Sequence, residues 1–220
     1  MTSTYADRLV RLGRQQEGLE LARAAVARAR SAGNALWLVF ALRTMSIAYI
    51  HLGQLPEAES TIQETASALG TGSAMDQHFL GMVERLRGLL ELQRGNAAVA
   101  LQSAEASLTA MAGGANGKPL DERTSLNLAA RAALASGRAA NAEHFARQSL
   151  NVAEAVARGP DTSADVGEAL LLVAEAEIAQ GRSAAAALLL ERATQCLTNG
   201  LGADHLLTRE AVALAKSIHV

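Results

Sequence analysis

The sequence predicts an all-α protein built from repeated pairs of helices, and two observations support this prediction. Among 220 residues, alanine occurs 48 times and leucine 33 times, whereas valine and isoleucine together number 16 and aromatic residues number 6. Alanine and leucine favour helices, whereas strands favour β-branched and aromatic side chains. The second observation is a glycine followed five positions later by a small residue, a pattern that recurs five times at spacings of 40 to 44 residues. The glycines are Gly13, Gly53, Gly95, Gly137 and Gly181, and the small residues are Gly18, Ala58, Ala100, Ala142 and Ala186.

Each repeat is expected to contain two helices joined at its glycine. Glycine has no Cβ, so it suits the left-handed backbone conformation that often ends a helix. In the second repeat the apolar residues before the glycine follow helical spacing, since Leu38, Leu42, Met45 and Tyr49 fall on one stripe. The small residue after the glycine would let the second helix approach the first closely.

The repeats are expected to follow one another along the chain and to form one domain over residues 1–220. They are predicted to span approximately 1–32, 34–70, 75–112, 119–158 and 161–199, with a capping helix over 204–219. Asp204 would cap this last helix, because a carboxylate can accept from the exposed N–H groups of a first turn. Gly13 leaves the first helix shorter than its counterparts. We therefore hypothesise that the chain is part of a longer protein with sequence before Met1; a short natural first helix is the alternative.

This pattern resembles the tetratricopeptide repeat (TPR) family over essentially the whole chain. The second repeat has Leu42, Ser46, Tyr49 and Gly53 where that family has an apolar, a small and a large residue and then the turn glycine. The fourth repeat matches through Leu126, Ala130, Ala133 and Gly137. Three glutamates depart from the pattern at positions for large residues: Glu84, Glu91 and Glu177. The period near 42 residues is similar to the long-helix variants found in kinesin light chains and bacterial signalling proteins, and the resemblance implies a right-handed superhelical solenoid of about five repeats with a C-terminal capping helix.

The resemblance also implies a concave groove, lined by the first helices of successive repeats, that holds a peptide or a partner helix. Carried over residue by residue, the groove positions are Phe40, Arg43, Ile47, Ile50, Met82, Arg85, Leu89, Leu92, Thr124, Asn127, Arg131, Leu134, Glu168, Leu171, Glu175 and Ile178. Arginine and asparagine side chains there can bind peptide backbone or carboxylates, which favours an acidic partner. The alternative is that these arginines are solvated or pair with Glu84 or Glu91. The single tryptophan, Trp37, is expected to pack between repeats.

Composition and charge exclude several function classes. A formal net charge of −2 gives no basic surface for nucleic acid. The one cysteine, Cys196, cannot form an internal disulfide, so we expect a cytoplasmic protein in which this residue is a buried small hydrophobe. The longest apolar run, residues 35–42, is far too short to span a membrane.

No motif in the sequence indicates catalysis, a cofactor or a metal. The histidines are isolated from one another, unlike metal ligands at short spacing; they are His51, His78, His144, His205 and His219. The glycine-rich segments 113–118 and 70–75 lack the residues of a phosphate-binding loop. Glu175 and Glu177 point to different sides of a helix and do not form an acid–base pair.

The sequence therefore predicts a non-enzymatic protein–protein interaction scaffold, the TPR part of a larger bacterial regulatory or signalling protein. Two alternatives remain open. One is a ligand- or signal-peptide-sensing domain that controls an attached kinase or transcription regulator. The other is a self-assembly module that forms a homodimer through the final helix, using Leu206, Leu207, Val212, Leu214 and Ile218.

Overall fold

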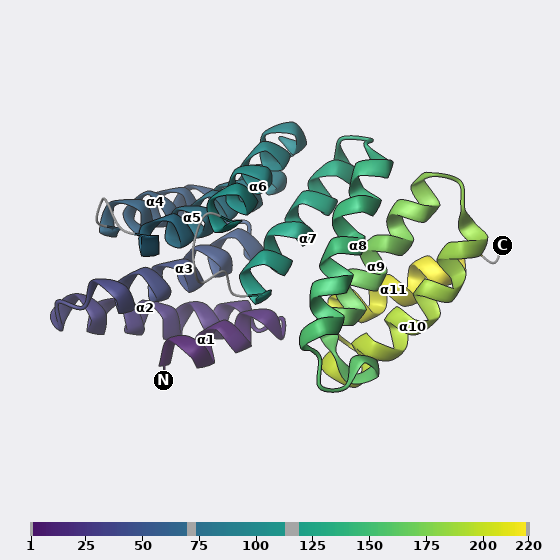
Figure 1. Cartoon of the computed structure of the whole chain (residues 1–220). Coiled ribbons are helices and arrows are strands. Elements are labelled where there is room, and N and C mark those ends of the chain that lie inside the picture. The colour runs from purple at the N-terminus through teal and green to yellow at the C-terminus, as the bar shows by residue number, and fades with distance from the viewer. Residues whose placement is uncertain (1, 70–73, 113–118, 219–220) are drawn as a thin grey trace. The chain divides into compact units, whose positions relative to one another are not determined.

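The computed structural model describes residues 2–69, 74–112 and 119–218, and these residues form helices with no strand among them (Figure 1). The predicted all-α fold is confirmed. In chain order the α-helices are α1 (Thr2–Arg11), α2 (Gln15–Ser31), α3 (Ala35–His51), α4 (Leu55–Ala68), α5 (Ala74–Gln93), α6 (Ala97–Ala112), α7 (Pro119–Ala135), α8 (Ala139–Val156), α9 (Ala164–Ala179), α10 (Ser183–Leu201) and α11 (Leu206–Ser217). A short 3-10 turn, Pro160–Thr162, precedes α9.

These helices belong to two compact units. Unit 1 covers Met1–Asn116 with helices α1 to α6, and unit 2 covers Gly117–Val220 with helices α7 to α11. Within each unit, successive helices pack as pairs, and the first helices of neighbouring pairs also touch: α1 contacts α3, α3 contacts α5, and α7 contacts α9. Each unit therefore has a layer of first helices lying side by side. The single domain expected over 1–220 stays a prediction.

The five turn glycines end their helices as predicted. Their φ angles lie between 70° and 82°, in the left-handed region that side chains other than glycine rarely adopt. At Gly53 the N–H donates to the Ile50 carbonyl at 3.1 Å, and the next N–H, from Gln54, donates to the Tyr49 carbonyl at 2.9 Å. This pairing satisfies carbonyls that the end of α3 would otherwise leave open. A tight turn then leads directly into the second helix of each pair.

The small residues after the turns lie where two helices meet. Ala58, Ala100, Ala142 and Ala186 are completely buried, which confirms their predicted role. Gly18 marks the tightest approach, because a Cβ added there would lie 2.5 Å from Val10 Cγ2 and 3.0 Å from the Ala6 carbonyl oxygen. Alanine-rich composition thus follows from close helix pairing.

Each unit has its own apolar core. Leu42 and Ile62 lie in the core of unit 1, and Leu170 and Leu190 lie in that of unit 2. Cys196 belongs to the second core, as predicted; its thiol donates to the Pro160 carbonyl oxygen at 3.3 Å, and burial raises its pKa. The thiol therefore stays protonated and acts as a packing group.

Two local predictions were wrong. The last helix is capped by His205, whose Nδ1 accepts from the Leu207 N–H at 3.3 Å, while Asp204 is exposed one residue earlier. Trp37 is 60 % exposed and does not pack between repeats. It lies in the first turn of α3, where its backbone N–H donates to Asn34 Oδ1 at 2.9 Å and neighbouring helices leave most of its side chain uncovered.

Some predictions concern residues outside the described part of the chain. These are the segments 70–73 and 113–118, which hold the glycine clusters, and His219. Among the described helices, none is both long and apolar enough to cross a membrane.

Candidate interaction surfaces

An exposed apolar surface of the first-helix layer in unit 1 lies on α3; we call it the α3 face and define it as Leu36, Trp37, Phe40, Arg43 and Ile47. Spacings of three and four residues place these side chains on one side of the helix. Leu36 is 44 % exposed, and Phe40, Arg43 and Ile47 are partly exposed. The Phe40 ring is held edge-on against Phe79 of α5, with ring centroids 5.7 Å apart. The face therefore combines a fixed aromatic ring with freely exposed apolar groups.

Arg43 lies in the middle of the α3 face and is tied to α1. Its Nη2 donates to Asp7 Oδ1 at 2.7 Å, while its Nε is buried without a hydrogen-bond partner. The expected alternative partners are used elsewhere: Glu84 pairs with Arg87 at 2.6 Å and Glu91 with Arg94 at 2.8 Å. Arg43 is thus partly exposed and paired with Asp7 rather than with Glu84 or Glu91.

Several predicted groove residues are not accessible. Ile50, Met82 and Leu171 are 2 %, 3 % and 0 % exposed and belong to the apolar cores, so they contribute packing rather than surface. The Asn127 side-chain oxygen accepts from the Ser149 hydroxyl in the interior of unit 2. Arg85 is 4 % exposed.

The remaining predicted residues keep partial exposure on their helices. In unit 1 these are Leu89 and Leu92 on α5, in addition to the α3 residues already described. In unit 2 they are Thr124, Arg131, Leu134, Glu168, Glu175 and Ile178. The structure therefore gives each unit a partly exposed first-helix face, apolar in unit 1 and charged in unit 2.

The charged face of unit 2 centres on what we call the Arg131 cluster: Arg131 of α7, Glu168 and Glu175 of α9, and Glu210 of α11. Arg131 Nη2 lies 3.4 Å from Glu168 Oε1. Burial of the Arg131 guanidinium opposes its charge, but Glu168, Glu175 and Glu210 together raise its pKa. Burial raises the pKa of Glu175 to about 7; Arg131 lowers it, and Glu210 and Glu168 raise it. Arg131 thus contacts one carboxylate, that of Glu168, which also pairs with Arg123, and the charges of Glu175 and Glu210 raise the pKa of Arg131 further.

Arg123 is a structural residue that the sequence did not reveal. It is 2 % exposed, with Nη2 at 2.7 Å from Asp165 Oδ1 and Nη1 at 3.1 Å from Glu168 Oε2. These contacts join α7 to α9, and Arg123 is separated from Asp165 by 42 residues, one repeat period. A search for opposite charges one period apart would have found this pair.

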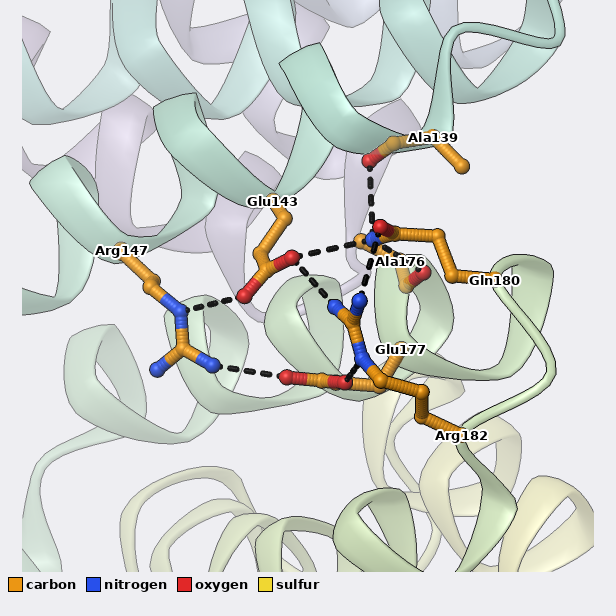
Figure 2. Close-up of polar contacts among 7 residues, drawn as sticks. All are labelled: Ala139, Glu143, Arg147, Ala176, Glu177, Gln180 and Arg182. Carbon is orange, nitrogen blue, oxygen red and sulfur yellow. Dashed lines mark hydrogen bonds and ion pairs between the residues drawn. The ribbon is translucent and has the colours of Figure 1, made fainter.

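A second polar network fixes the turn between α9 and α10 against α8 (Figure 2). Arg147 bridges Glu143 and Glu177 at 2.7 Å each, and Arg182 pairs with the same two carboxylates. Gln180 Nε2 also donates to Glu143 at 3.0 Å. Hydrogen bonds from Arg147, Gln180 and Arg182 lower the pKa of Glu143 to about 2. Glu177 therefore faces α8, on the side of α9 opposite to Glu175, as predicted.

The described residues contain no group of three or more histidine, cysteine, aspartate or glutamate side chains arranged to hold a metal ion.

Paired helices, left-handed turn glycines, and first helices that touch their counterparts define a TPR-like repeat fold. Comparison with solved structures gives the same class. BtubC (BKLC) from P. vanneervenii matches with a TM-score of 0.66 and 20 % identity, covering 94 % of this chain and 91 % of that one. Two structures of the putative kinesin light chain TPR-like repeats of Podosopora anserina, one of them a single-substitution variant, match with TM-scores of 0.54 and 0.52, each at 20 % identity over 90 % of this chain and 93 % of theirs. No family model and no curated protein matches the sequence.

Proposed function

We propose that this chain is a non-enzymatic scaffold that binds a partner protein or peptide on its first-helix faces. The observation that supports this most is the α3 face, where Trp37 is 60 % and Leu36 44 % exposed beside Phe40. Burying such side chains releases about 1.5–3 kcal/mol each, and clustered exposed apolar groups commonly mark interaction sites. TPR-like repeats generally mediate protein interactions, which agrees with this use of the surface.

Arg43 gives the α3 face a polar anchor. An acidic segment would bind by replacing Asp7 as the partner of Nη2. Charge-assisted bonds to a guanidinium are directional, so they would orient a peptide whose apolar side chains contact Phe40 and Ile47. We further propose that the scaffold is cytoplasmic and belongs to a larger bacterial regulatory or signalling protein.

The test begins with affinity capture by the whole chain and identification of the captured protein by mass spectrometry. The affinity of the purified partner is then measured by calorimetry for the wild type, for the Phe40→Ala/Ile47→Ala double variant, and for Val99→Ala. Val99 is a matched control, since it is 47 % exposed on α6, a second helix.

We expect the double variant to weaken binding at least tenfold and Val99→Ala to leave it unchanged. Equal affinities for the wild type and the double variant, with helicity preserved, would place the partner elsewhere.

A further inference from the structure

Two aromatic side chains occupy the same position in successive repeats of unit 1 but differ in exposure. Trp37 lies sixteen residues before the turn glycine Gly53, and Phe79 lies sixteen residues before Gly95. Trp37 is 60 % exposed, whereas Phe79 is 6 % exposed. The first turn of α3 therefore exposes an aromatic group at a position that the following repeat buries.

Phe79 is covered by the first turns of the preceding first helix, α3. Val39 of α3 forms a buried cluster with Phe79 and Met82, to which the end of α4 also contributes. The Phe40 ring lies edge-on to the Phe79 ring, with centroids 5.7 Å apart. Val39 is fourteen residues before Gly53. In unit 1, the side chain fourteen residues before one turn glycine thus covers the side chain sixteen residues before the next.

Unit 2 has the same arrangement with charged side chains. Arg123 lies fourteen residues before Gly137, and Asp165 lies sixteen residues before Gly181. Arg123 Nη2 pairs with Asp165 Oδ1 at 2.7 Å. The contact is therefore a property of how first helices pack in this chain, and its chemistry is apolar in unit 1 and ionic in unit 2.

Helix α1, as described, does not cover Trp37 in this way. It begins at Thr2, eleven residues before Gly13, which is three residues short of the covering position. Its polar contact with α3 lies further along, where Asp7 pairs with Arg43 at 2.7 Å. Among the described residues, Trp37 therefore lacks the helix turn that covers its counterpart on α5.

We propose that the partner of the α3 face is an α-helix that lies end to end with α1 and packs apolar side chains against Trp37 and Leu36. This inference rests on the proposed function, because it names the kind of partner that the same face binds. The partner segment is helical, since a helix turn covers the equivalent side chain in both units, and it is apolar, since the cover of Phe79 is apolar. It continues the packing of first helices that α1, α3 and α5 already form.

A helix supplied by the chain itself is the first probe. The extended variant carries a copy of residues 34–40 directly before Met1, with alanine in place of the copied tryptophan. The copy brings its own N-cap, Asn34, and places its valine fourteen residues before Gly13. Trp37 remains the only tryptophan and reports on its own burial. The matched control has the same extension with serine in place of the copied valine and phenylalanine.

We expect Trp37 emission in the extended variant to shift to shorter wavelength and its quenching by iodide to fall severalfold, because the added turn covers the ring. The control extension should leave both properties close to those of the wild type. The proposal is overturned if Trp37 is as exposed in the extended variant as in the wild type. It is also overturned if sedimentation shows that the wild type buries Trp37 by forming a dimer, which would assign the face to a second copy.

The purified partner is then titrated against the wild type, the extended variant and the control. The extension should weaken binding about tenfold or more, because it fills the apolar site, and the control should bind as the wild type does. A synthetic peptide of the partner segment that the complex protects from hydrogen exchange should gain helicity when it binds.

Two results of these titrations contradict the inference, namely undiminished binding to the extended variant and a bound segment that is not helical. If Phe40→Ala/Ile47→Ala weakens binding while the extension has no effect, this inference fails and the proposed function stands. If the whole chain captures no partner, both fail.

Discussion

Protonation of Glu143 should detach the network that holds the α9–α10 turn on α8. In the folded chain its carboxylate receives hydrogen bonds from Arg147, Gln180 and Arg182, which lower its pKa from 4.5 to about 2. A lowered pKa means that the stabilisation is complete above pH 4.5 and is lost as the pH falls towards 2. Unit 2 should therefore lose stability on acidification over this range.

The magnitude follows from the size of the shift. A change from 4.5 to about 2 corresponds to about 3 kcal/mol if the interactions act at full strength. The Glu143 side chain is 20 % exposed and both arginines are more exposed, so solvent screening should reduce this to about 1–2 kcal/mol. For a unit of this size, 1 kcal/mol shifts the melting temperature by about 4–8 °C.

The assay is urea-induced unfolding followed by circular dichroism at pH 6.0, 4.5 and 3.0 for the wild type, Glu143→Gln and the control Glu191→Gln. Glu143→Gln should be about 1–2 kcal/mol less stable than the wild type at pH 6.0, and the difference should shrink at pH 3.0. Because other carboxylates titrate in both proteins, only this difference reports on Glu143. A difference that stays constant from pH 6.0 to 3.0 would refute the reasoning, as would a Glu143→Gln variant as stable as the control.

Three further measurements test the structure. Gly18→Ala should destabilise unit 1 by about 1–3 kcal/mol, because its Cβ would meet Val10 and the Ala6 carbonyl. Gly53→Ala, where nothing lies within 4 Å of the Cβ but φ is +70°, should cost about 1–2 kcal/mol from backbone strain alone. Thermal melts of both variants check these values, and a Gly18→Ala variant as stable as the wild type would contradict the close helix approach. Glu175→Gln should be as stable as the wild type at pH 4 but about 2 kcal/mol more stable at pH 8. The reason is that the raised pKa of Glu175 gives stability that is complete below pH 4.5 and lost as the pH rises to about 7. Urea titrations measure this, and a stability difference of the same size at both pH values would contradict it. Trp37 fluorescence should be red-shifted and strongly quenched by iodide, since the side chain is 60 % exposed, and a blue-shifted emission resistant to iodide would show that it is packed.

The repeat architecture could be predicted from sequence because its requirements are local. A left-handed turn at Gly53 and a fully buried small residue at Ala58 depend only on how two adjacent helices meet. These requirements recur with each repeat, so their period appears directly in the sequence.

The surface could be predicted only in part, because exposure depends on the neighbouring repeat. Ile47 and Ile50 both occupy groove positions by family register, yet Ile47 stays partly exposed while Ile50 lies in the core. The side chain of Trp37 in the first turn of α3 is 60 % exposed among the described residues, and no periodicity in the sequence reveals this exposure. Arg43 likewise pairs with Asp7 on an adjacent first helix rather than with a residue of its own repeat.

The polar contacts between repeats also restrict how this chain can vary. Arg123 reaches Asp165 and Glu168 in the following repeat, and Arg147 reaches Glu177 in the same way. Each pair has its acid in one repeat and its base in another, so the repeats are not interchangeable copies. A duplicated or exchanged repeat would keep its helices and its turn glycine but would lose these partners. The charged residues of unit 2 thus determine the order of its repeats, whereas the glycines and alanines determine the repeated pairing of helices.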